Sequence, residues 1–221
     1  MKVCIIGNGL VSLTLANVLI KKDIFVDIFT STKNIKYGKS RTLGISQSNI
    51  DFFNKEVVNI EKILWAIKSI KIYTEKDLKK EVLKFDDEKK VFSIIRNSQL
   101  QKLLLEKLKK NKLVKFHSNY NYSKVDQNEY KLIINSDPSH PYIKKYFSKK
   151  IEKKYNSLAY TTTFLHKKIK NNIAFQNFTR KGPLAFLPIS NKETSVVYSF
   201  MSLNKKKNFE INNLIKKYNP I

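Results

Sequence analysis

Two glycines separated by one residue, Gly7-Asn8-Gly9, stand between two apolar segments near the start of the chain. Residues 3–6 form a short, continuously apolar run, which is typical of a buried strand, whereas the apolar residues of 10–22 recur at helical spacing. A second short apolar run, residues 24–29, follows at once and predicts another strand. The chain therefore opens with a strand-turn-helix-strand unit, which indicates an α/β fold.

The spacing of the glycines in this first turn is typical of a dinucleotide-binding fingerprint. In that motif the first glycine makes the tight turn, the second lets the backbone approach a pyrophosphate, and the third packs the helix against the strand. Gly7 and Gly9 fill the first two places, and Ser12 fills the third. A helix that begins at Leu10 would point its free N–H groups at the phosphates. The turn predicts a phosphate site built from Gly7, Asn8, Gly9, Leu10 and Ser12; the alternative is a plain connection without a ligand.

The end of the second predicted strand lacks the acidic residue that usually holds a ribose in such folds. Thr30 occupies that place, and its hydroxyl can make one hydrogen bond to a ribose. Asp27 lies three residues earlier, on the other face of the strand, and we expect it at the surface. An NAD-dependent dehydrogenase is therefore a weaker interpretation than another nucleotide enzyme.

The composition limits what the formal charge of +25 implies. Forty of the 43 basic residues are lysine, and the chain has 25 Ile and 22 Asn against 5 Ala and 5 Gly. This profile is typical of an AT-rich coding sequence, and the lysines are spread in short clusters. We therefore expect no specific nucleic acid partner. The three arginines, Arg41, Arg96 and Arg180, are better candidates for defined contacts, because a planar fork of donors is hard to replace by lysine.

The remainder of the chain predicts one clear amphipathic helix and many strands. Asn97 or Ser98 caps the helix, and its apolar face consists of Leu100, Leu103, Leu104 and Leu108. Residues 91–95 form a strand or the entry to this helix, and residues 63–67 form a short helix or loop. Strands are expected at 70–73, 81–85, 113–116, 130–134, 160–165, 173–178, 184–188 and 195–201.

Side chains of catalytic or metal-binding type are sparse. His117, His140 and His166 have no Glu or Cys at metal-ligand spacing, so we expect surface histidines and no metal. The single cysteine, Cys4, lies in the first predicted strand and is expected to be a buried apolar side chain. No nucleophile motif occurs, which is consistent with chemistry carried by a cofactor, and we assign no catalytic residue.

Four segments resemble, in the right order, motifs of the flavin-dependent aromatic-ring hydroxylases, and within them the ubiquinone-biosynthesis monooxygenases. They are VCIIGNGLVSLTLANVLI at 3–20, SRTLGISQSNIDFF at 40–53, VFSIIRNSQLQKLLLEKL at 91–108 and FTRKGPLAFLPI at 178–189. The first is similar to the FAD fingerprint, and the second places Arg41 at the family's arginine position. The last is similar to a substrate-sheet motif of the ubiquinone hydroxylases.

Two departures from the family pattern accompany the resemblance. The family's Ala-Asp-Gly stretch ending in Ser maps onto Ser136-Asp137-Pro138, with Pro141 at the final place. Asp137 is kept, but two prolines lack the backbone N–H that a flavin contact could use. The family's second flavin signature begins with a Gly-Asp pair, and no such pair occurs in residues 1–221. The resemblance therefore implies a fragment or truncated form.

The resemblance implies a Rossmann-like, FAD-binding βαβ layer interleaved with an antiparallel substrate-binding sheet, C-terminally incomplete. We expect the FAD-binding layer at 1–50 and 88–140 and the substrate sheet at 51–87 and 141–221. The implied FAD contacts come from Gly7, Asn8, Gly9, Leu10, Ser12, Thr30, Arg41 and Asp137.

The implied activity is hydroxylation of an aromatic ring of a polyprenylated ubiquinone precursor, with FAD as cofactor and NAD(P)H and O₂ as co-substrates. The alternative is a non-catalytic remnant or nucleotide-binding module that lacks the second flavin signature. The partner is then a lipid-like phenol or quinone precursor. We expect a cytoplasmic protein whose basic surface contacts the inner membrane peripherally, because each lysine near an anionic membrane contributes about 1 kcal/mol.

Overall fold

The computed structural model describes residues 1–30, 41–78, 80–118, 127–146, 149, 151, 153, 155–201 and 211–219. The chain divides into two units: unit 1 comprises Met1–Gly38, Ser48–Lys62 and Asn97–Glu152, and unit 2 comprises Lys39–Gln47, Ile63–Arg96 and Lys153–Ile221. These units interleave along the sequence, with boundaries other than those expected from the motifs. The assignment of a FAD layer and a substrate sheet to them stays a prediction.

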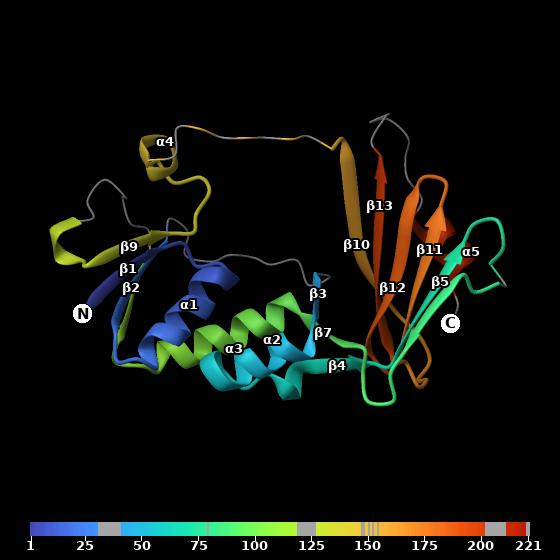
Figure 1. Cartoon of the computed structure of the whole chain (residues 1–221), viewed down its shortest axis with the longest axis horizontal. Coiled ribbons are helices and arrows are strands. Elements are labelled where there is room, and N and C mark those ends of the chain that lie inside the picture. Colours follow the sequence, from blue (N-terminus) through green and yellow to red (C-terminus); the bar gives the residue numbers. More distant parts are fainter. Residues whose placement is uncertain are drawn as a thin grey trace. The chain divides into compact units, whose positions relative to one another are not determined.

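Unit 1 is built on a four-stranded parallel sheet with the order β8-β2-β1-β9 (Figure 1). Its strands are β1 (Lys2–Ile6), β2 (Phe25–Thr30), β8 (Val114–Ser118) and β9 (Leu132–Asn135). Helix α1 (Leu10–Ile20) joins β1 to β2, which confirms the predicted strand-turn-helix-strand opening. The first strand is fully buried from Val3 onward, since it lies between two neighbours inside the sheet.

Helix α3 (Asn97–Lys109) packs beside α1. The predicted apolar face is confirmed for Leu100, Leu104 and Leu108, whereas Gln101 is buried in addition. The Asn17 side chain joins the two helices, because its Nδ2 donates to the carbonyl oxygen of Leu104 at 3.3 Å and to that of Leu13 at 2.8 Å. These bonds satisfy the Asn17 Nδ2, whereas the Asn17 Oδ1 is buried without a hydrogen-bond partner among the described residues.

A second cluster of unit 1 contains Cys4, Ile6 and Phe29, against which Tyr130, Ile133 and Tyr142 pack. Cys4 is fully buried, as predicted. The short helices of this part are η4 (Gln127–Glu129) and α4 (Tyr142–Tyr146). Before them, α2 (Gln47–Phe52), the π-helical η1 (Phe53–Val57) and the 3-10 helix η2 (Glu61–Ile63) follow one another along the chain.

Unit 2 contains a six-stranded sheet with the order β10-β13-β12-β11-β5-β6, antiparallel except where β11 lies parallel to β5 (Figure 1). The strands are β5 (Ser69–Thr74), β6 (Leu83–Asp86), β10 (Ser157–Leu165), β11 (Ile173–Thr179), β12 (Gly182–Ser190) and β13 (Glu193–Met201). All were predicted, with shifted ends. Helix α5 (Ile211–Tyr218) covers one face, where Leu184, Phe186, Val196 and Tyr198 are fully buried.

A three-stranded antiparallel sheet completes unit 2, with the order β3 (Thr42–Ile45), β7 (Phe92–Arg96) and β4 (Leu64–Ile67). Ile67 and Ile94 pack there against Ala174 and Ile189 of the larger sheet. The expectation of a short helix or loop at residues 63–67 is therefore wrong, because this segment finds a strand partner in β7. Such pairing over a long sequence separation leaves no local signal.

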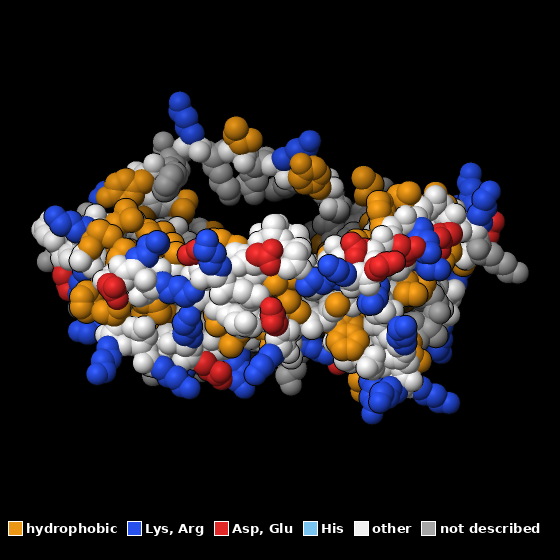
Figure 2. Space-filling view, turned by 60° about the horizontal axis from the view of Figure 1, so that its bottom comes forward, with side chains coloured by type: hydrophobic (Ala, Val, Ile, Leu, Met, Phe, Trp, Pro, Cys, Tyr) orange, Lys and Arg blue, Asp and Glu red, His pale blue; other side chains and the backbone are white. Residues whose placement is uncertain are grey.

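The chain is thus α/β, with a parallel Rossmann-like sheet in unit 1 and antiparallel sheets in unit 2, as predicted. Lysine and arginine side chains are scattered over the face shown in Figure 2, with carboxylates among them. Among the described residues, no helix is long and apolar enough to span a membrane.

Candidate functional site

The turn between β1 and α1 requires glycine at its first position. Gly7 has a φ of +110°, a region that residues with a Cβ atom rarely adopt. A Cβ atom at Gly7 would lie 2.6 Å from the Ser136 Oγ and 3.4 Å from the backbone N of Asp137. The Gly7 N–H donates to the carbonyl oxygen of Phe29 at 2.8 Å, which fixes the turn to β2. The first glycine of the fingerprint therefore has the structural role that the motif predicts.

The third fingerprint position is occupied by a buried serine with a defined partner. Ser12 is fully buried, and its hydroxyl forms a short hydrogen bond with the Ser136 hydroxyl. Ser136 in turn follows β9, and its N–H donates to the carbonyl oxygen of Ile6 at 2.9 Å. The pair thus joins α1 to the end of β9, a link that a glycine at position 12 could not make.

Helix α1 leaves its N-terminal end without a side-chain cap. Gly9 is the N-cap residue with extended backbone, no side chain caps the helix, and no acidic residue lies in its first turn. The first intrahelical bond runs from the Leu13 N–H to the Gly9 carbonyl oxygen at 3.0 Å. The first-turn N–H groups, beginning with Leu10, and the positive end of the helix dipole are therefore presented at the turn.

A cleft of about 480 Å³ lies at the carboxyl ends of the parallel strands. It is lined by Asn8 from the β1–α1 turn, by Thr30 at the end of β2 and by Ser118 at the end of β8. Helix α3 supplies the other side with Ser98, Gln101, Lys102, Leu105, Glu106 and Lys109. The carboxyl edge of a parallel sheet is where ligands bind in open α/β folds. Sequence reasoning missed the contribution of α3, although Gln101 is a polar residue beside the apolar face formed by Leu100, Leu104 and Leu108.

Thr30 lies at the predicted place, but the expectation for Asp27 is wrong. Thr30 is the last residue of β2, in register with Ser118, and only 7% of its surface is exposed. Asp27 is 4% exposed rather than a surface residue. It accepts a hydrogen bond from the Tyr130 hydroxyl at 2.8 Å and pairs with the Lys2 ammonium at 3.0 Å. These two partners compensate the negative charge, so the carboxylate can be buried at a lower cost in free energy.

The contacts with Asp27 change the pKa values of its two partners, Tyr130 and Lys2. Burial and the hydrogen bond to Asp27 raise the pKa of Tyr130 far above its ordinary value. Hydrogen bonds to Glu129 and Asp27 raise the pKa of Lys2, which keeps this ammonium charged. Lys2, Asp27 and Tyr130 therefore stabilise the sheet through charge and hydrogen bonding. None of the three lines the cleft at the strand ends.

The backbone of Asp137 lies beside Gly7, and the expected FAD contact of Asp137 stays a prediction. Its Oδ1 accepts hydrogen bonds from the Ser139 N–H at 2.9 Å and from the Ser139 hydroxyl at 2.6 Å, so this carboxylate stabilises its own loop. Pro141 precedes α4, and its carbonyl oxygen accepts from the Lys144 N–H at 3.0 Å. A proline at a helix start loses no intrahelical bond, which explains why it is tolerated here.

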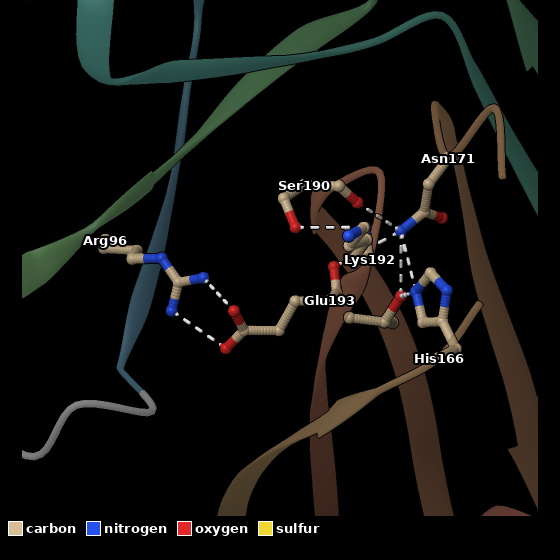
Figure 3. Close-up of polar contacts among 7 residues, drawn as sticks. Arg96, His166, Asn171, Ser190, Lys192 and Glu193 are labelled. Atoms are coloured by element: carbon tan, nitrogen blue, oxygen red, sulfur yellow. Dashed lines mark hydrogen bonds and ion pairs between the residues drawn. The ribbon is translucent and has the colours of Figure 1, made fainter. Parts of the chain in front are cut away.

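Arg41, the remaining predicted contact, lies directly before β3 in unit 2 and is exposed. The expectation that Arg41 lies close to the Gly7-Asn8-Gly9 turn stays a prediction. Arg96 lies within unit 2 and pairs with both carboxylate oxygens of Glu193, at 3.1 and 2.5 Å (Figure 3). The Arg96 guanidinium holds the pKa of Glu193 below its usual range.

A network around Asn171 stabilises the same end of the sheet (Figure 3). The Asn171 Nδ2 donates to the carbonyl oxygen of Ser190 at 2.8 Å and to the Thr194 hydroxyl at 3.0 Å. His166 Nε2 lies 3.1 Å from the same hydroxyl. His140 is only 2% exposed, so the expectation of a surface histidine is wrong for it. Among the described residues, no group of three His, Cys, Asp or Glu side chains is placed to hold a metal ion.

Comparison with known proteins gives a match in structure alone. No family model matches the sequence, and no curated protein matches it. PqsL, a probable FAD-dependent monooxygenase from Pseudomonas aeruginosa, matches 91% of this chain and 60% of its own, with a TM-score of 0.69 and 16% identity. CtdE, crystallised with FAD and a substrate, matches 99% of this chain and 62% of its own, with a TM-score of 0.72 and 14% identity.

A third match is 2,6-dihydroxypyridine-3-hydroxylase from Arthrobacter nicotinovorans, with a TM-score of 0.67 and 11% identity over 90% of this chain and 56% of that enzyme. The chain thus spans about 60% of the length of the first of these solved structures. At such low identity the likeness concerns the fold. The protein has the fold of the FAD-dependent aromatic monooxygenases over this part of their length.

Proposed function

We propose that unit 1 binds the adenosine diphosphate portion of FAD, as part of a flavin-dependent aromatic-ring monooxygenase. The observation that carries this proposal is the turn at Gly7, where the absence of a Cβ atom, the uncapped start of α1 and the strand-end cleft adjoin one another. A dinucleotide needs such a close backbone approach for its pyrophosphate and such a cleft for its nucleoside.

Each part of the site has a distinct task in this proposal. The N–H groups at the start of α1 donate to the pyrophosphate, and Gly9 keeps the approach open. The hydroxyls of Thr30 and Ser118 and the amide of Asn8 hydrogen-bond the ribose or the base in the cleft. When bound, the flavin supplies hydride acceptance and oxygen activation, so the chain needs no nucleophile of its own.

The substrate in this proposal binds unit 2, on the face of the six-stranded sheet opposite α5. Alternation along the strands places Gln176, Ala185 and Val197 on that face, and all three are partly exposed. A half-exposed face with two apolar side chains and one amide suits an aromatic ring that carries a polar substituent. The motif FTRKGPLAFLPI at 178–189 favours a polyprenylated phenol of ubiquinone biosynthesis as substrate, with NAD(P)H and O₂ as co-substrates.

A lipid-like substrate of this kind resides in membranes, and the formal charge of +25 would favour an anionic membrane surface. Co-sedimentation with liposomes tests this contact. The proposal expects binding that increases with the fraction of anionic lipid and decreases with salt. Binding that is insensitive to both would contradict it.

A nucleotide-binding module without turnover is the second candidate. Two observations favour it. The hydrogen-bonded hydroxyls of Ser12 and Ser136 occupy space that a glycine at the third fingerprint position would leave open. Pro138, directly after Asp137, has no backbone N–H to donate to a ligand. Tight flavin binding without NAD(P)H oxidation, in the presence of prenylated phenols, would support this second function.

A substitution that fills the cleft tests the proposed cofactor site. Ser118 is exposed at the end of β8 and lines the cleft, so Ser118→Trp should block FAD while leaving the fold intact. Lys115 is exposed on the same strand but does not line the cleft, so Lys115→Trp is a matched control. Flavin fluorescence titrations should show at least about tenfold weaker binding for Ser118→Trp alone. Equal affinities of the two variants would place the flavin elsewhere.

A further inference from the structure

Unit 2 contains a second cleft, of about 680 Å³, at one end of its six-stranded sheet. It is formed by the turn after β5, the turn between β11 and β12, and the last turn of α5, which gather at one end of the sheet (Figure 1). The register of the parallel pair β5–β11 places Thr74 beside Phe178, so the two turns emerge side by side. We call it the basic cleft; it is lined by Thr74, Glu75, Lys76, Phe178, Thr179, Arg180 and Lys217.

The single carboxylate of the basic cleft is already compensated by the fold. Glu75 Oε2 accepts the Arg180 N–H at 2.7 Å, and Glu75 Oε1 accepts the Tyr218 hydroxyl at 2.9 Å and lies 3.5 Å from the Lys217 ammonium. These donors, led by the Arg180 N–H, hold the pKa of Glu75 below its usual range. Glu75 therefore positions the two turns and α5 relative to one another.

Positive charge remains after Glu75 is compensated. Lys76, Arg180 and Lys217 against one carboxylate leave the lining with a formal charge of +2. Within the described part of the chain, no carboxylate pairs with the Lys76 ammonium or with the Arg180 guanidinium. The Arg180 hydrogen bond to Glu75 uses the backbone N–H and not the guanidinium, yet Arg180 is one of only three arginines among 43 basic residues. A guanidinium fork is suited to bidentate recognition of carboxylate or phosphate.

The cleft also has an apolar wall. Phe178 is 47% exposed although it belongs to a strand, and it lies two residues before Arg180 on the same strand and turn. An exposed aromatic ring beside a cationic group suits a ligand with a planar or apolar body and an anionic head group.

We propose that the basic cleft binds a small aromatic oxyanion, whose phosphate or carboxylate group is held by Arg180 and Lys76 and whose ring lies against Phe178. This site shares no residue with the strand-end cleft of unit 1, so it can be tested apart from the proposed flavin site. Phe178, Thr179 and Arg180 begin the 178–189 segment that the proposed function assigns to the substrate sheet.

Titration of the ¹⁵N-labelled full chain with phenyl phosphate, benzoate and inorganic phosphate tests the proposal, in about 150 mM NaCl to screen exposed lysines. The expected result is saturable shifts of the amides of Thr74, Glu75 and Arg180, with phenyl phosphate or benzoate binding more tightly than inorganic phosphate. The tighter of the two aromatic ligands identifies the head group. Shifts that spread over lysine-rich segments without saturation, or equal affinity for inorganic phosphate, would overturn the proposal.

Arg180→Ala supplies the decisive variant, because it removes the guanidinium but keeps the N–H that Glu75 accepts. Affinity should decrease about tenfold or more, and Arg180→Lys should restore only part of it. Lys167→Ala is the matched control, since Lys167 is an exposed cation of unit 2 outside the cleft, and it should bind like the parent chain. Unchanged binding by Arg180→Ala would refute the site even if the parent chain binds the ligands.

Discussion

Arg96 and Glu193 form a two-point ion pair, with both guanidinium Nη atoms donating to the two carboxylate oxygens. Their side chains are 21% and 22% exposed, so water screens the pair only in part. The pair links the end of β7 to the start of β13 within unit 2. Arg96, which lies in the strand-to-helix segment at 91–108, thus stabilises the packing of β7 and β13.

Removing one partner of this pair should destabilise the protein. We expect Glu193→Gln to lower the free energy of unfolding by about 1–2 kcal/mol at neutral pH, because the charge-assisted pair is lost. Arg96 lowers the folded-state pKa of Glu193 below 4.5, so the stabilisation is present above pH 4.5 and is lost as the pH falls through the folded value. Urea unfolding at a series of pH values checks this. A difference that persists undiminished at the acidic end would contradict the ion pair.

Glycine is required at position 7 but not at position 44. Gly7→Ala places a Cβ atom 2.6 Å from the Ser136 Oγ at a positive φ and should cost about 1–3 kcal/mol of stability. Gly44→Ala meets only the Phe92 ring, at 3.5 Å, and should leave stability unchanged or slightly raised. Thermal unfolding of the two variants tests the difference. Equal melting temperatures would show that the turn does not have the described geometry.

The buried carboxylate of Asp27 should contribute more to stability than the hydroxyl that contacts it. Asp27→Asn removes the charge that pairs with Lys2 and is expected to cost about 1–3 kcal/mol. Tyr130→Phe removes one hydrogen bond and should cost about 1 kcal/mol. Urea unfolding measures both. A larger effect of Tyr130→Phe would mean that the ring hydroxyl, rather than the carboxylate, anchors this cluster.

Cys4 should be unreactive in the folded protein. Burial raises the pKa of its thiol to about 12, and the side chain is fully buried in β1. A thiol reagent at neutral pH should therefore modify no cysteine in native protein and one in urea. Rapid modification without denaturant would show that the first strand opens readily.

The parts of the fold that local pattern specifies were predictable. The opening unit, α3 and the strands of the larger sheet have their own periodicity and turn residues. Strand β4 and the burial of Asp27 were not predictable, because each depends on partners far away in sequence, namely β7 and Tyr130. The share of α3 in the strand-end cleft likewise follows from the packing of unit 1. Gly7, Ser12 and the Asp137 backbone lie near one another, and their expected contacts to FAD stay predictions.

A visible absorption spectrum of the purified chain, incubated with FAD and then desalted, tests the central claim most directly. If unit 1 forms the proposed cofactor site, the spectrum should retain flavin bands whose shape differs from that of free FAD. A colourless protein after desalting would contradict the proposed site in this chain.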